Sequence, residues 1–247
     1  MAELFGHYRI TAESSGHQIK ILDQKIAIDG PPARTVYRRF VGDELVTQTN
    51  IVSDKELVVV GIFPAPPIYT PQEISSAAYL KFKSPVVVDP RSEVIVYCKM
   101  PIEIGVFRQT DDEELMIDAF SPAPQRYALY GSPESGVVCR YADTEAAGTE
   151  EQVQVMKYYE ALVRIRIMNE IQNVVKVTKV ILPLSGVVLD HAHDDTWLPG
   201  SVEMLLDSSF GKDIVNVRYV NAKVKREDKT SVQRREENLA FLMDAGY

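Results

Sequence analysis

Three arginines stand inside runs of residues that read as β-strands, and they are the first candidates for chemistry. Arg38 and Arg39 are neighbours, so a strand places them on opposite faces, and one must lie on the more buried side. Arg140, followed by Tyr141, lies in a second strand-like run and shares a face with an apolar residue. A buried guanidinium needs carboxylate or carbonyl partners, because removing its charge from water is costly.

Two hypotheses account for these arginines. The first is an internal network of ion pairs between strands, with Glu103, Asp43 and Glu44 as candidate partners. The second is an anion pocket that binds a carboxylate or phosphate ligand. The candidate binding residues are Arg38, Arg39, Glu103, Arg140 and Tyr141.

One short segment contains the residue types of a metal site. His191 and His193 are two residues apart, so on a strand they would share a face, and Asp195 continues the pattern. These three residues are the candidate ligands of a metal-dependent hydrolase. The alternative is a solvated polar turn, because the segment follows a strand-like run and precedes Pro199-Gly200.

These candidates have to be positioned by β-strands. From Glu93 to Phe107 every even position is apolar, which is typical of a strand with one buried face, and Pro101 predicts a bend, bulge or edge there. Gly42-Asp43 has the chemistry of a two-residue hairpin link between Thr35–Val41 and Glu44–Asn50. A change of alternation within Val174–Leu182 predicts a β-bulge near Thr178-Lys179.

The fold class expected from these patterns is all-β, with two antiparallel β-sandwich domains. Good helix formers in Ser231–Asp244 predict a short C-terminal helix. Polar, small residues from Asp143 to Gln152 indicate a boundary or at least an exposed loop. The expected division is a β domain over 1–145, a second β-sandwich over 152–225, and a charged linker with the helix over 226–247.

The composition of the chain indicates which classes of partner it is suited to bind. The chain has 247 residues and a net charge of −8, which disfavours nucleic acid and anionic membranes as partners. No apolar run approaches the length of a membrane helix and no signal peptide is visible, so we expect a soluble cytoplasmic protein without membrane insertion. The two cysteines, Cys98 and Cys139, are expected to be buried thiols, and a bridge between them stays open. The sequence shows no phosphate loop, dinucleotide fingerprint or nucleophile elbow, and we expect no cofactor.

Three sequence blocks carry a resemblance to a known family. They are Tyr37–Glu44, Pro101–Phe107 and Tyr127–Tyr141. As a set they resemble the signature blocks of an archaeal family catalogued as domain of unknown function 432, most clearly before Asp143. The resemblance implies no activity and no catalytic residues, and the His191–Asp195 segment is not part of it.

The expected function is a non-enzymatic binding or interaction module, since no catalytic constellation is recognisable. One alternative is the metal-dependent hydrolase that would use His191, His193 and Asp195. Another is a structural or assembly protein that acts through strand edges or the C-terminal helix, by self-association or with a protein partner.

Overall fold

The protein is built from short β-strands. The computed structural model describes residues 4–14, 16–21, 23–70, 74–110, 113–193, 195–209, 212–220 and 241–244. In this part of the chain the helical elements are two single 3-10 turns, η1 (Pro32–Arg34) and η2 (Glu150–Gln152). The expected all-β class is confirmed. Over the same residues, no helix has the length and apolar character needed to cross a bilayer.

The strands gather into two compact units that interleave along the chain. Unit 1 comprises Met1–Ala65 and Glu103–Pro122, and unit 2 comprises Pro66–Ile102 and Ala123–Tyr247. The chain therefore leaves unit 1 after residue 65, builds part of unit 2, and returns. Ala65 and Glu103, where it leaves and re-enters, are paired neighbours in one sheet.

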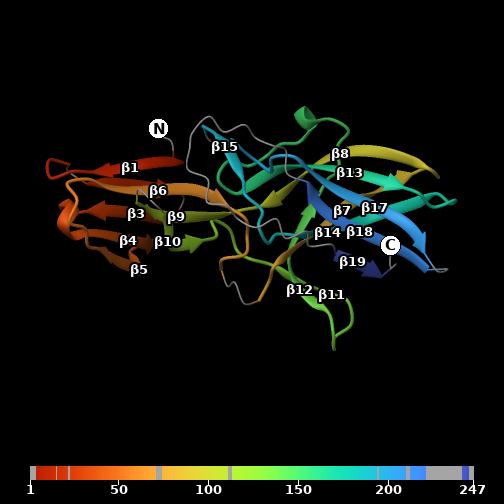
Figure 1. The fold of residues 1–247 in the computed structure, drawn as a ribbon, viewed down its shortest axis with the longest axis horizontal. Coiled ribbons are helices and arrows are strands. Elements are labelled where there is room, and N and C mark those ends of the chain that lie inside the picture. The colour runs from red at the N-terminus through yellow and green to blue at the C-terminus, as the bar shows by residue number, and fades with distance from the viewer. Residues whose placement is uncertain are drawn as a thin grey trace. The chain divides into compact units, whose positions relative to one another are not determined.

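Unit 1 consists of two four-stranded antiparallel sheets (Figure 1). The first has the order β1-β6-β9-β10 and contains β1 (Gly6–Ile10), β6 (Val58–Ala65), β9 (Glu103–Gln109) and β10 (Glu114–Phe120). The second has the order β2-β3-β4-β5 and contains β2 (His17–Ile21), β3 (Gln24–Asp29), β4 (Thr35–Val41) and β5 (Glu44–Ile51).

The inner faces of these sheets form an aliphatic core. Ile26, Ile28, Val60, Ile62 and Ile104 are all fully buried. Alternation along each strand sends these side chains to one face, so the two sheets can pack as layers of a sandwich.

Unit 2 also has two sheets, one of four and one of seven strands, and both are mixed (Figure 1). One has the order β11-β12-β7-β14, with β7 (Ala77–Val88), β11 (Tyr127–Tyr130), β12 (Val137–Thr144) and β14 (Val175–Pro183), and its β12–β7 pair is parallel. The other contains β8 (Ser92–Pro101), β13 (Glu160–Asn169), β15 (Asp190–Ala192), β16 (Asp195–Trp197), β17 (Ser201–Ser209), β18 (Lys212–Val220) and β19 (Phe241–Asp244).

Strand β13 is central to the second sheet of unit 2. It pairs with β8 in the antiparallel sense and with β17 in the parallel sense. Its side chains Val163, Ile165 and Ile167 are fully buried, as the sequence alternation predicts. Asn169 ends the strand, and its side-chain amide donates to the backbone oxygens of Val88, Asp89 and Asn173.

Several local predictions are confirmed. β4 and β5 flank Gly42-Asp43, and Gly42 has a φ of 58° that suits glycine. The pairing of β14 with β7 shifts register between Val177 and Lys179, where the bulge was expected. The alternating run from Glu93 to Phe107 is interrupted at Ile102, and its two parts, β8 and β9, belong to different units.

The C-terminal prediction has a mixed outcome. At residues 241–244 the structure contains strand β19, which pairs with β18, in place of the last residues of the expected helix. Cross-strand pairing overrides helix propensity here, because propensity is only a weak local preference. The expected linker and the preceding part of the helix, residues 226–240, lie outside the described residues.

The division of the chain expected from composition stays a prediction. The polar segment around residues 145–152 connects β12 to β13, and both strands belong to unit 2. Most of this segment is exposed, as expected of a loop. The compact units interleave, whereas the expected domains follow one another along the chain.

Candidate functional site

Arg39 is the arginine of β4 that faces the interior of unit 1. Its Nε donates to Oδ2 of Asp118 on β10 at 2.7 Å, and the two side chains are only 9% and 8% exposed. Further N–H groups reach Gln24 at 3.3 Å and Thr47 at 3.2 Å. The guanidinium also lies 4.7 Å from the ring centroid of Phe120. This is the internal network that was one of the two hypotheses for the arginines.

The carboxylate partner of Arg39 differs from the expected ones. Asp43 and Glu44 are exposed at the β4–β5 turn, while Asp118 comes from the opposite sheet. Asp118 Oδ2 also accepts a hydrogen bond of 2.7 Å from the fully buried Tyr37 hydroxyl. Burial, followed by the charge of Asp118, raises the pKa of Tyr37 far above its ordinary value, so this phenol stays a hydrogen-bond donor.

Arg38 faces the other side of β4. It bonds Asp29 and Gln48 at 3.3 and 3.1 Å, and its side chain is 34% exposed. The prediction that one arginine of the pair lies on the more buried side is therefore confirmed, and Arg39 is that residue. Glu103 begins β9 and is fully buried, with its backbone paired to Ala65.

Arg140 and Tyr141 belong to unit 2, on opposite faces of β12. Arg140 is 3% exposed. Its Nε donates to the backbone oxygen of Pro67 at 3.0 Å and its Nη1 to the Tyr127 hydroxyl at 2.8 Å. The next side chain, Tyr141, points to the outer face of the sheet and is part of a different cluster.

Tyr141 is paired with a second tyrosine across the parallel strands. In the β12–β7 register it lies beside Tyr79, and the two ring centroids are 5.6 Å apart with a tilt of 35°. The next pair on this face, two residues along each strand, is Asp143 with Lys81. Both tyrosines are partly exposed, and Lys81 and Asp143 are exposed.

Arg126, the residue directly before strand β11, completes this cluster. Its guanidinium lies 5.0 Å from the Tyr141 ring centroid, and its Nη1 donates to Asp143 Oδ2 at 3.2 Å. Asp143 Oδ1 accepts a hydrogen bond of 2.5 Å from the Tyr141 hydroxyl. We call Tyr79, Lys81, Arg126, Tyr141 and Asp143 the tyrosine face.

The hydrogen bonds of the tyrosine face reinforce the ordinary protonation states of Tyr141 and Asp143. The hydrogen bond to Asp143 raises the pKa of Tyr141 above its ordinary value. The same bond, with help from Arg126, lowers the pKa of Asp143. At neutral pH the Tyr141 phenol is therefore neutral and the Asp143 carboxylate is ionised, and both lie beside the side chains of Lys81 and Arg126.

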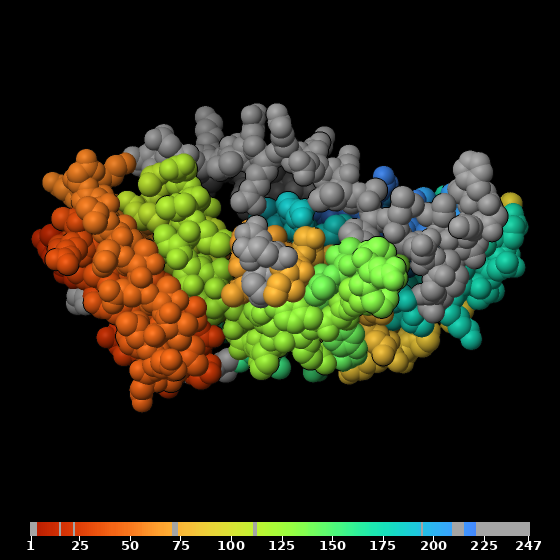
Figure 2. Space-filling view, turned by 90° about the horizontal axis from the view of Figure 1, so that it is seen from below, coloured from red at the N-terminus to blue at the C-terminus, as the bar shows by residue number. Residues whose placement is uncertain are grey.

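Further residues extend the tyrosine face at both ends. Lys83 forms an ion pair with Glu145 at 2.8 Å, which continues the Tyr79·Tyr141 and Lys81·Asp143 ladder. Tyr130, on the β11–β12 hairpin, meets Tyr79 edge-on with ring centroids 6.4 Å apart. In Figure 2 this hairpin, drawn in green, lies on the face of the molecule turned to the viewer.

Tyr141 is the one member of the tyrosine face that was a candidate binding residue from the sequence. The period-two patterns Tyr79-Leu80-Lys81 and Tyr141-Ala142-Asp143 are visible in the sequence, and each places its polar residues on one face. Their juxtaposition was not predictable, because β7 and β12 are parallel strands far apart in the chain.

The segment considered for metal binding forms a tight hairpin. Ala192 pairs with Asp195 at the ends of β15 and β16, and His193 in the turn has a φ of 55°. The strand ends before His193, so the shared face assumed for His191 and His193 is not formed. Within the described residues, which leave out Asp194, no group of three or more His, Cys, Asp or Glu side chains could hold a metal ion.

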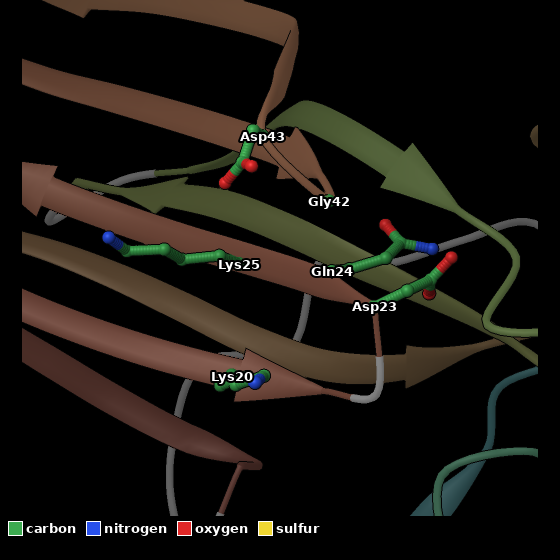
Figure 3. Close-up of a pocket in the computed structure, with 6 residues that line it drawn as sticks. All are labelled: Lys20, Asp23, Gln24, Lys25, Gly42 and Asp43. Carbon is green, nitrogen blue, oxygen red and sulfur yellow. The ribbon is translucent and has the colours of Figure 1, made fainter.

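A shallow pocket of about 280 Å³ lies at the turn end of β2, β3 and β4 in unit 1. It is lined by Lys20, Asp23, Gln24, Lys25, Gly42 and Asp43. Figure 3 shows that the charged ends of Lys20 and Lys25 point in different directions and do not converge. An anion would therefore meet one ammonium group and nearby carboxylates, which is a poor binding environment.

Comparison with known proteins identifies the family but no characterised relative. The model of the family described as "Protein of unknown function (DUF432)" matches residues 4–244. The chain belongs to this family. Searches of the curated proteins and of the solved structures gave no match.

The DUF432 match covers both compact units and includes every residue of the tyrosine face. In this DUF432 protein the buried arginines are held by internal acceptors. Asp118 holds Arg39, while the Pro67 carbonyl and the Tyr127 hydroxyl hold Arg140. The tyrosine face differs, because its charged groups are directed toward solvent. It therefore offers hydrogen-bond donors, acceptors and ring surfaces that a ligand can reach.

Proposed function

We propose that this protein is a non-enzymatic binding module and that the tyrosine face is its binding surface. The observation that carries the proposal is the Arg126–Asp143–Tyr141 arrangement beside the Tyr79 ring. Aromatic rings provide apolar contact area at little cost in conformational entropy, and ionised groups beside them provide orientation. Rings and ionised groups that stay accessible at one place are a common feature of recognition sites.

The position of the tyrosine face supports this proposal. Tyr141 and Asp143 lie on the regular strand β12, whose other face contributes the buried Arg140 and Thr144. Side chains on a strand anchored in this way are held in place before a ligand arrives, which lowers the entropic cost of binding.

A ligand screen by thermal unfolding tests the proposal. The panel comprises neutral oligosaccharides, nucleotides, carboxylates, phosphates, single-stranded oligonucleotides and peptides. A compound at about 100 times its dissociation constant adds about 2.7 kcal/mol of stability. We expect at least one class to stabilise the natural protein and to lose this effect in Tyr141→Ala.

Tyr97→Ala is the matched control. Tyr97 is a partly exposed tyrosine of the same unit, but it lies on β8 in the other sheet. The compound that stabilises the natural protein should stabilise the Tyr97→Ala variant by the same amount. Stabilisation that is equal in all three proteins, or no stabilisation by any class, would overturn the proposal.

A further inference from the structure

The tyrosine face has the chemistry to select one class of ligand. We propose that it binds a neutral carbohydrate, an inference that rests on the proposed function. The carbohydrate would lay one sugar ring against the pair Tyr79 and Tyr141, and its hydroxyls would bond Asp143 and Arg126.

The ring surfaces fit a sugar in size and in character. A pyranose has an apolar face of C–H groups and a polar rim of hydroxyls, so it gains contact on an aromatic ring without losing the hydration of its rim. The Tyr79 and Tyr141 rings lie on adjacent strands with centroids 5.6 Å apart. Together they offer an aromatic surface about as wide as a sugar ring. The Arg126 guanidinium lies over the Tyr141 ring, 5.0 Å from its centroid, so the sugar would rest on the exposed part of the pair and meet Arg126 through its hydroxyls.

The polar groups match a pair of adjacent hydroxyls. Each oxygen of Asp143 accepts one hydrogen bond from the protein, Oδ1 from Tyr141 and Oδ2 from Arg126. A carboxylate oxygen can accept two hydrogen bonds, so both oxygens can accept from a ligand as well. The Arg126 guanidinium carries five N–H groups, and its side chain is 58% exposed. The hydroxyls of a vicinal diol both donate and accept hydrogen bonds. The Asp143 carboxylate can accept from them, and the Arg126 guanidinium can donate to them.

The distribution of charge favours a neutral ligand over a polyanion. Arg126 is paired with Asp143, Lys83 is paired with Glu145, and Lys81 also lies beside Asp143, so each of these cations has a carboxylate neighbour. Binding of a nucleic acid strand depends on lysines and arginines that displace counterions from phosphates, and carboxylates between them oppose it. The net charge of −8 for the whole chain acts in the same direction.

Calorimetric titration of the full chain tests the inference. The probes are cellohexaose, maltohexaose and chitohexaose as neutral ligands and oligo-dT as the polyanion. The variants are Asp143→Asn, Arg126→Met and Tyr141→Ala, with Tyr97→Ala as the control. The exposed positions of Arg126 and Asp143 allow these variants to fold, and their unfolding temperatures verify it.

We expect at least one hexasaccharide to bind and its affinity to fall about tenfold or more in Asp143→Asn and Arg126→Met. The affinity should be unchanged in Tyr97→Ala and in about 0.5 M NaCl, since no net charge is neutralised on binding. Oligo-dT or another anion that binds in a Tyr141-dependent and salt-sensitive way, with no heat from the hexasaccharides, would overturn the carbohydrate and leave the proposed function standing. No Tyr141-dependent ligand at all would overturn both.

Discussion

Arg38 and Arg39 are adjacent in the sequence, and their environments differ because a strand alternates its faces. Arg39 is enclosed with Asp118, whereas Arg38 and its partner Asp29 are 34% and 41% exposed. A buried ion pair is costly to break, because the remaining partner is left charged without water. A partly exposed pair is weak, because solvent screens it.

The two aspartates therefore make a matched comparison. Asp118→Ala should lower the free energy of unfolding by about 3–5 kcal/mol, because Arg39 would stay buried without its carboxylate. Asp29→Ala should lower it by less than about 1 kcal/mol. Urea unfolding at neutral pH measures both. Equal losses in the two variants would contradict the assignment of Asp118 as the structural partner.

Burial raises the pKa of thiols and phenols, so the free energy of unfolding should fall as the pH becomes alkaline. Burial raises the pKa of Cys98 from 9.0 to about 12. The unfolded chain loses this proton near pH 9 and the folded chain does not, so ionisation favours the unfolded state as pH rises. The contribution of Cys98 to the free energy of unfolding should be fully present below pH 9. It should be lost as the pH rises toward 12, by at most about 1.4 kcal/mol per pH unit.

Cys98→Val isolates this contribution, because valine keeps the site apolar and does not ionise. Between pH 9 and the ordinary phenol pKa of 10.0, urea unfolding of this variant should show a flatter pH dependence than the natural protein. Above pH 10 both should decline, because burial raises the pKa of Tyr8 and of Tyr219 to about 12. The same slope in both proteins between pH 9 and 10 would be inconsistent with a buried Cys98 thiol.

Among the elements, the parallel pair β7 and β12 has a ladder of complementary side chains on its outer face. Tyr79 lies beside Tyr141, Lys81 beside Asp143, and Lys83 is paired with Glu145. Cross-strand pairs of this kind favour one register over its neighbours, because a slip by one residue sends each side chain to the opposite face.

A charge swap tests this ladder. Lys83→Glu and Glu145→Lys should each lower stability slightly at low salt, because like charges then face each other. The double variant should recover the loss, since it restores an opposite-charge pair. Thermal unfolding at low and high salt measures the effect, which should vanish at high salt. If the stability losses of the two single variants add up in the double variant, the Lys83–Glu145 pair does not contribute to the register of β7 and β12.

Local signals predicted the elements that are defined by near neighbours in the sequence. The Gly42-Asp43 hairpin and the bulge between Val177 and Lys179 were visible because turn chemistry and alternation are local. Strands β1, β2, β3, β6, β15, β16 and β19 were missed. Strand β6 (Val58–Ala65) is a nearly continuous apolar run with a proline, which does not alternate.

The remaining contacts could not be predicted because they join residues that are far apart in the chain. Arg39 finds its carboxylate at Asp118, which is 79 residues away, and no local pattern links the two. Tyr141 was a candidate because it follows Arg140 in a strand, but Tyr79 and Arg126 join it only through the arrangement of three strands. Alternation predicts which face a side chain takes and says nothing of its neighbours in the sheet.

For the whole molecule, interleaving means that unit 1 is made of two separate segments. Because Ala65 and Glu103 are paired neighbours in antiparallel strands, a two-residue Asn-Gly turn can join them directly. The shortened chain, residues 1–65 joined to 103–122, should unfold cooperatively in urea as a folded domain. It keeps both sheets of unit 1 complete.

A chain of residues 1–145 provides the comparison. It retains β7 and β8 but lacks their partners β14 and β13, so it leaves strand edges and apolar side chains unpaired. Because it contains both segments of unit 1, we expect it to show the transition of unit 1 only, with no cooperative unfolding of its unit 2 residues. Cooperative unfolding of 1–145, and none of the shortened chain, would favour the division expected from composition.

Amide chemical-shift mapping over the whole chain tests the proposed binding surface most directly. The natural protein would be titrated with the compound that stabilises it most in the unfolding screen. We predict shifts concentrated on the tyrosine face, at Tyr79, Lys81, Arg126, Tyr141 and Asp143, and absent in Tyr141→Ala. Shifts concentrated around Arg39 in unit 1, or on the β8–β13 sheet of unit 2, would contradict the account.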